Sequence, residues 1–228
     1  VGYWAAPSDS DDGASFGNYY QVSTFARLNA GGYDGGITVE SLLENGDFGI
    51  GTVEGIDGEM IIRDGVPYRV GTDLTPVPVL AGTMIPFAML TQFSSSLSYR
   101  AQDIDDYNEL RDVFDGLVSD GHIGYAVMIE TEFESITIRS VPGQVIPYPP
   151  LAQVIAQQTT MTLHDVQGTM IGFLLADDLG DINLAGFHLH FLSEDMCYGG
   201  HVLDMSFDEA DVHMDAMISI SVNFTATG

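Results

Sequence analysis

The sequence contains no lysine, and its six arginines face 33 aspartates and glutamates, which gives a formal net charge of −27. Nucleic acids and anionic membrane surfaces carry negative charge themselves and would repel such a chain. The composition therefore predicts neither as a partner. Acidic residues are spread along the whole chain, a pattern typical of proteins kept soluble by self-repulsion in high salt. An exported protein in an acidic medium is an equally open interpretation.

The sequence is also poor in cysteine and in long apolar runs. Cys197 is the only cysteine, so no intrachain disulfide can form, and nothing indicates an oxidising compartment. The best apolar run, residues 84–93, is interrupted by Pro86 and is far shorter than the roughly 20 residues of a membrane span. Because the first residue is Val1, the compartment stays open between the cytoplasm and export with a removed signal.

The 228 residues are 45% hydrophobic, which predicts a packed core. Strands, a helix and further strands occur twice, before and after about residue 145. We therefore predict an α+β fold with a loose N-terminal lead (1–18) and two mixed-sheet halves (19–145 and 146–228), packed as one body because no low-complexity linker separates them. We predict strands over residues 21–25, 123–130, 135–141, 161–175 (broken near Asp165), 185–193, 201–207 and 216–224, a hairpin over 60–70 turning at 64–65, and helices over 39–44 (capped by Thr38), 105–117 and 149–158.

Three of the six histidines lie in the segment 186–204. His188 and His190 alternate with apolar residues before a short polar break that contains glycine, and His201 follows the break. This pattern predicts a β-hairpin in the second half. Alternate side chains share a face of a strand, so His188 and His190 point the same way and Leu189 points to the other side. A reversal around residues 195–196 would put His190 opposite His201, with Cβ atoms roughly 5 Å apart.

Three imidazoles on one face of a hairpin are the ligand set of a catalytic zinc with open coordination positions. Imidazole also binds iron, cobalt, nickel or copper, so the ligands favour zinc without proving it. A His-x-His alternation alone is more often two ordinary histidines, and it is the spacing of His201, next to Gly199 and Gly200, that favours a metal. Cys197 lies in the turn, where a role as fourth ligand is conceivable.

The hairpin resembles the metal-binding signature of acetolactate decarboxylases, and further segments resemble that family in its order along the chain. The resemblance runs from about residue 20 to residue 204. The segments that carry it are Phe187-His188-Leu189-His190-Phe191-Leu192-Ser193 with Gly199-Gly200-His201-Val202-Leu203-Asp204, and residues 20–23, 47–52, 56–60, 139–144 and 147–151.

The resemblance implies that the three histidines hold the zinc. Glu59 would reach the metal site as a ligand or proton carrier, Arg139 would contact the substrate carboxylate, and Thr52 would line the pocket. The family also places a glutamate from its C-terminal tail at the metal, whereas the last acidic residue in this sequence is Asp215. Which group takes the role of that glutamate is open.

The implied reaction is the decarboxylation of 2-acetolactate to acetoin and carbon dioxide by a carbon–carbon lyase. Zinc would chelate the hydroxyl and ketone oxygens of this 2-hydroxy-3-keto acid and act as a Lewis acid for the enediolate. A positioned acid would then protonate the enediolate. Arg139 suits a carboxylate because its guanidinium presents a planar fork of donors. A homodimer is left open.

Other interpretations remain open at this stage. Without the resemblance, Arg139 reads as a surface residue and Glu59 as an exposed turn carboxylate. A cupin-like metal enzyme would use Glu194 as a ligand, and a non-catalytic acidic protein would bind metal without turnover. Thr52 alone would be an ordinary threonine, and the remaining histidines, His122, His164 and His213, read as ordinary surface or core residues.

Overall fold

The computed structural model describes residues 4–5, 17–114 and 122–224. Most of the predicted lead, residues 1–18, and the end of the predicted helix 105–117 lie outside these residues. The strands are β1 (Trp4–Ala5), β2 (Gly17–Val22), β3 (Ile37–Thr38), β4 (Phe48–Thr52), β5 (Glu59–Arg63), β6 (Val66–Val70), β7 (Pro76–Pro78), β8 (Met84–Ile85), β9 (Phe87–Thr91), β10 (Leu97–Ile104), β11 (Gly124–Ser140), β12 (Thr159–Leu175), β13 (Gly186–Ser193) and β14 (Gly199–Asn223). The helices are α1 (Phe25–Asn29), α2 (Val39–Leu43), α3 (Tyr107–Phe114) and α4 (Leu151–Ile155), with 3-10 turns over Glu54–Ile56 and Asp177–Ile182.

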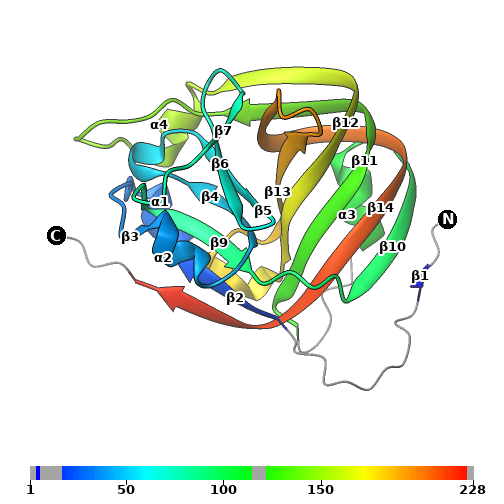
Figure 1. The fold of residues 1–228 in the computed structure, drawn as a ribbon, viewed down its shortest axis with the longest axis horizontal. Helices are drawn as coiled ribbons and strands as arrows, with labels where there is room; N and C mark the ends of the chain where they lie inside the picture. The colour runs from blue at the N-terminus through cyan, green and yellow to red at the C-terminus, as the bar shows by residue number, and fades with distance from the viewer. Residues whose placement is uncertain (1–3, 6–16, 115–121, 225–228) are drawn as a thin grey trace.

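The fold is mostly β, with a few short helices around one large mixed sheet (Figure 1). Its strand order is β11-β12-β13-β14-β2-β9-β4-β5-β6-β7, with β10 on β14 and β1 on β10. Strand β11 also pairs with β14, so β11 to β14 form a closed ring of pairings. The pairing of β14 with β2 is parallel, and β3 pairs with β8 in a separate sheet. The predicted division at residue 145 stays a prediction.

The helices cover the two ends of the sheet. In Figure 1, α1, α2 and α4 lie together beside β4 and β6, whereas α3 lies at the other end beside β10 and β14. The largest core cluster is built mainly from β10 to β14 and α3, and it includes Leu189 and Phe191. None of the helices in the described part of the chain has the length and apolar character needed to cross a membrane.

Several elements form where local sequence signals predict them. The side chain of Thr38 accepts a hydrogen bond from the backbone N–H of Ser41 and so caps α2. Asp64 and Gly65 both have positive φ, 52° and 74°, as a two-residue type I′ turn between β5 and β6 requires. The His-bearing segment is a hairpin, with β13 antiparallel to β14. These three predictions are confirmed.

Other boundaries differ from the prediction. The two strands predicted over 123–130 and 135–141 are the single strand β11, because Thr131 and Phe133 continue the buried face between exposed glutamates. The strands predicted over 201–207 and 216–224 likewise merge into β14. Asp165 has φ 51°, yet β12 continues through it. Phe25 is helical and not the end of a strand, because Thr24 caps α1.

Candidate metal centre

Strand register brings the three histidines and Arg139 together. His190 on β13 is the register partner of His201 on β14, as the hairpin predicts. On its other side, His201 pairs with Arg139 on β11. His188 lies two residues before His190, on the same face of β13, while Leu189 and Phe191 point into the core. The pairing of strands that are distant in sequence therefore builds a single polar cluster.

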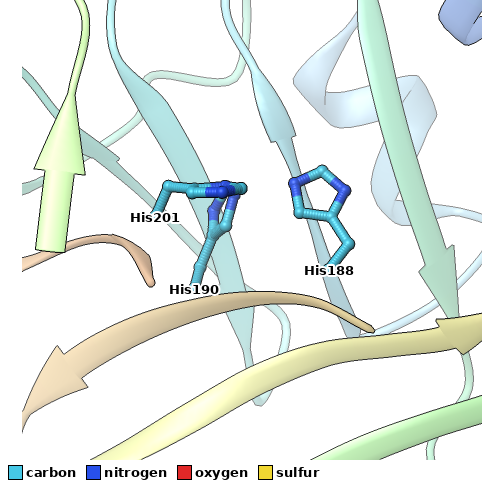
Figure 2. Close-up of side chains that lie close together, drawn as sticks. All are labelled: His188, His190 and His201. Carbon is cyan, nitrogen blue, oxygen red and sulfur yellow. The ribbon is translucent and has the colours of Figure 1, made fainter. Parts of the chain in front are cut away.

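The three imidazole rings face one another, as Figure 2 shows. Their ring centroids lie 5.0 Å (His188 and His201), 5.2 Å (His188 and His190) and 5.3 Å (His190 and His201) apart. One ligand nitrogen from each ring lies within 4.8 Å of the others. Within the described residues, this is the one group of three or more His, Cys, Asp or Glu side chains close enough to hold a metal ion.

The hydrogen bonding of the rings fits a metal site. The buried nitrogens Nδ1 of His188, Nε2 of His190 and Nδ1 of His201 have no hydrogen-bond partner among the described residues. Nδ1 of His190 lies 3.0 Å from the carbonyl oxygen of Met60. Because a carbonyl only accepts, Nδ1 carries the proton and Nε2 of the neutral ring is left with a bare lone pair, the arrangement usual for a metal ligand.

The environment keeps these rings neutral. Burial lowers the pKa of His188 to about 4, and the nearby Arg139 guanidinium adds to the effect. Burial is also the main reason why the pKa of His190 and of His201 lies well below the usual range, with Arg139 and the neighbouring rings contributing. At neutral pH all three rings are unprotonated, which is the form that binds a metal.

Glu59 and Arg139 form a buried ion pair beside the histidines. Nη1 of Arg139 donates to Oε1 of Glu59 at 3.0 Å, and Oε2 of Glu59 lies 3.6 Å from Nε2 of His190. The side chains are 10% and 13% exposed, so neither the exposed turn carboxylate nor the surface arginine of the residue-by-residue interpretation is present. Burial raises the pKa of Glu59, while Arg139 opposes that shift. Glu59 can therefore hold a proton more readily than an exposed carboxyl.

Thr52 ends β4 and is buried at the edge of the site. Its hydroxyl donates to the carbonyl oxygen of Gly58 at 2.6 Å. This bond ties the two ends of the loop that leads into Glu59. Thr52 thus lies next to the cluster, and its hydroxyl proton is already donated to the Gly58 carbonyl oxygen.

One cavity of about 150 Å³ collects all six residues singled out in the sequence. Its polar floor is made by Glu59, Arg139 and the three histidines. The remaining wall is mostly apolar and comes from α1, α4 and the segments around them; its members are Phe25, Leu28, Ile56, Phe87, Val141, Leu151, Ile155 and Leu184. Sequence reasoning missed this wall, because its residues carry no signal that separates them from core residues.

The structure places the other candidate ligands away from the cluster. Cys197 and Glu194 are both exposed in the hairpin turn and are not members of the described donor group. A fourth ligand from Cys197 and a cupin-like set with Glu194 therefore have no support in the geometry. His213 lies near the hydroxyls of Ser95 and Ser98 and is not a member of the donor group.

The sequence profile of the family described as alpha-acetolactate decarboxylase matches residues 19–228. A Methanosarcina mazei protein named alpha-acetolactate decarboxylase is 36% identical over 209 residues, which cover 92% of this chain and 73% of the relative. A protein of the same name from Methylococcus capsulatus is 36% identical, and the alignment covers 86% of this chain and 75% of that relative. The crystal structure of alpha-acetolactate decarboxylase from Bacillus subtilis strain 168 superposes on this structure with a TM-score of 0.88 at 31% sequence identity. The superposition covers 92% of this chain and 90% of the Bacillus subtilis chain.

Proposed function

The chain belongs to the alpha-acetolactate decarboxylase family and is a carbon–carbon lyase, and on this basis we propose that it converts 2-acetolactate to acetoin and carbon dioxide with a bound zinc ion. The observation that carries the proposal is the meeting of three neutral imidazoles and the Glu59–Arg139 pair on the floor of one small cavity. Its volume equals about five waters, which suits a small organic acid.

His188, His190 and His201 would hold the metal. Three neutral imidazoles with open positions beside them are the donor set of catalytic zinc sites, although other divalent transition metals also bind imidazole. A zinc ion held there would supply Lewis-acid chemistry, polarising the substrate oxygens and offsetting the charge left by the loss of carbon dioxide. The hydrogen bond from His190 to the Met60 carbonyl orients that ring for the role.

Arg139 would bind the substrate carboxylate. Its hydrogen bond to Glu59 uses Nη1, and a guanidinium has five N–H donors in one plane. The other donors on the cavity side can form the paired hydrogen bonds that a carboxylate accepts. Arg139 therefore orients the group that is lost, and it holds Glu59 beside the reacting centre.

Glu59 would carry the proton. After carbon dioxide leaves, the substrate carbon must gain a proton, and a carboxyl whose pKa is raised by burial holds a proton for delivery more readily than an exposed carboxyl does. The apolar wall, including Phe25 and Leu151, limits water around the carbon being protonated. Thr52 lines the same cavity and supports the loop before Glu59.

The test is acetoin release from racemic 2-acetolactate by the isolated protein, by protein stripped with a chelator, and by stripped protein given zinc. We expect activity in the first and third samples and none in the second. Full activity in the stripped, metal-free protein would contradict a metal-dependent reaction. Retention of zinc without any turnover would instead identify a non-catalytic metal-binding protein.

A further inference from the structure

The Glu59–Arg139 pair joins two parts of the sheet that are not adjacent strands. Glu59 begins β5, whose partners are β4 and β6, whereas Arg139 lies near the end of β11 between β12 and β14. Neither strand's own ladder therefore sets the distance between the two side chains. Some other contact must hold the end of β11 against the start of β5.

Ser140 makes such a contact. It follows Arg139 directly, is completely buried, and its hydroxyl donates to the carbonyl oxygen of Val70 at 2.7 Å. Val70 is in turn the register partner of Glu59 in the β5–β6 ladder. One hydrogen bond thus links the neighbour of Arg139 to the strand partner of Glu59.

The backbone at Gly58 passes very close to the Val70 carbonyl that accepts this hydrogen bond. Gly58 has φ +91°, and a Cβ built there would lie 2.2 Å from the Val70 oxygen. Only glycine lets the chain before Glu59 pass so close to that oxygen. The contact of Val70 with Ser140 therefore lies in the tight packing at the start of β5.

Contacts farther from the cavity also join the segment after β11 to the loop before β5. The backbone N–H of Gln144 donates to the carbonyl of Gly55 at 2.7 Å. A Cβ at Gly143 would lie 2.8 Å from the carboxylate of Asp57, so this segment is in close contact with the loop before Glu59. Ser140 differs from these contacts because it is buried and immediately adjacent to Arg139.

We propose that Ser140 is a positioning residue that sets the geometry of the Glu59–Arg139 pair through the Val70 carbonyl. Strand β5 also supplies the Met60 carbonyl that orients His190, so the same bond supports both parts of the polar floor. The inference rests on the proposed function only in expecting that misplacing the pair lowers turnover.

The test compares Ser140→Ala with Thr131→Val. Thr131 is buried in the same strand, and its hydroxyl donates to the carbonyl oxygen of Glu209 at 2.5 Å, away from the cavity. Both variants lose one buried hydroxyl-to-carbonyl hydrogen bond, so we expect similar decreases in Tm of about 2–4 °C. We expect kcat/KM per folded molecule to fall about 10–100-fold in Ser140→Ala and to stay within about twofold of the parent in Thr131→Val.

Crystal structures of both variants supply a readout that does not depend on turnover. In Ser140→Ala the distance from Nη1 of Arg139 to Oε1 of Glu59 should exceed hydrogen-bonding range, while in Thr131→Val it should stay near 3.0 Å. An intact pair in Ser140→Ala, or equal kcat/KM in both variants, overturns the inference. If the parent protein shows no decarboxylase activity, the proposed function fails, and the measured distance still decides whether Ser140 positions the pair.

Discussion

At the residue scale, the chemistry of the site depends on keeping nitrogen lone pairs unprotonated in a buried place. Three imidazoles beside a guanidinium cannot all be charged without a large desolvation cost, so the environment lowers the pKa of each ring. The protein thereby presents ligands at neutral pH that a metal can bind without displacing protons. Each ring should matter individually, because three protein ligands are the minimum set of a catalytic zinc site.

We therefore expect His190→Ala to lose the bound metal. Removing one of three ligands should lower the metal content of purified protein at least about tenfold, and acetoin formation should fall with it. His213→Ala is the matched control, since His213 lies on β14 outside the cluster and should keep parent-level metal and activity. Metal content measured by mass spectrometry checks both variants. Full metal occupancy in His190→Ala would contradict the assignment of this ring.

Glu59→Gln should separate proton delivery from binding. The amide keeps the shape of the side chain but cannot donate the proton as a carboxyl does, so kcat should fall about 100-fold or more while KM changes little. The control is Glu132→Gln, an exposed glutamate of β11 that should leave both constants unchanged. Steady-state kinetics with 2-acetolactate measure the difference. A purely raised KM in Glu59→Gln would show that Glu59 contributes only to binding.

At the element scale, the site depends on how closely β12 packs against β13. Gly172 on β12 is the register partner of Leu189, between the two histidines of β13. A Cβ at Gly172 would lie 1.9 Å from the carbonyl oxygen of His188, far inside contact distance. The glycine therefore decides where the His-bearing strand can lie.

Gly172→Ala should displace β13 and with it the histidines. We expect a loss of about 1–3 kcal/mol in the free energy of unfolding, from overpacking against backbone, together with weaker metal binding. Gly82→Ala is the control, because nothing lies within 4 Å of a Cβ at that position. Urea unfolding and a metal titration measure the two effects. Equal behaviour of the two variants would show that β13 tolerates the displacement.

At the scale of the whole molecule, the net charge of −27 produces self-repulsion across an acidic surface. The arginines do little to offset it, because the described ion pairs of Arg63, Arg69 and Arg100 are partly exposed, and water and salt weaken the attraction within each pair. Long-range repulsion between like charges is screened by salt, from a Debye length of about 10 Å at 0.1 M to about 3 Å at 1 M.

The thermal stability should therefore rise with salt. We expect Tm to increase by several degrees between 0.1 and 1 M NaCl and then to level off, because screening is nearly complete at the higher concentration. Differential scanning calorimetry of metal-replete protein measures the change, with metal content checked at each concentration. A Tm that falls with added NaCl would show that attractive ion pairs outweigh the repulsion.

Several local features of this protein follow from short-range sequence patterns alone. The alternation of His188 and His190, the glycine-containing break and His201 predict the hairpin and its face, because side-chain direction along a strand follows from period two alone. Thr38 predicts the cap of α2 for an equally local reason. Glu59 and Arg139 differ in this respect. The turn-like pair before Glu59 and the usual exposure of a lone strand arginine both predict exposed residues, and only the resemblance to a family singles the two out.

The residues that surround the hairpin are set by contacts between distant segments of the chain. Strand order places β5 so that Glu59 reaches Arg139, and it places Phe25 and Leu184 on the same cavity, although these residues are far apart in sequence. The same packing joins the strands predicted separately on either side of residues 131–134 into β11. Period-two alternation specifies which face a residue occupies but not which strand lies beside it, since that choice depends on contacts between distant segments.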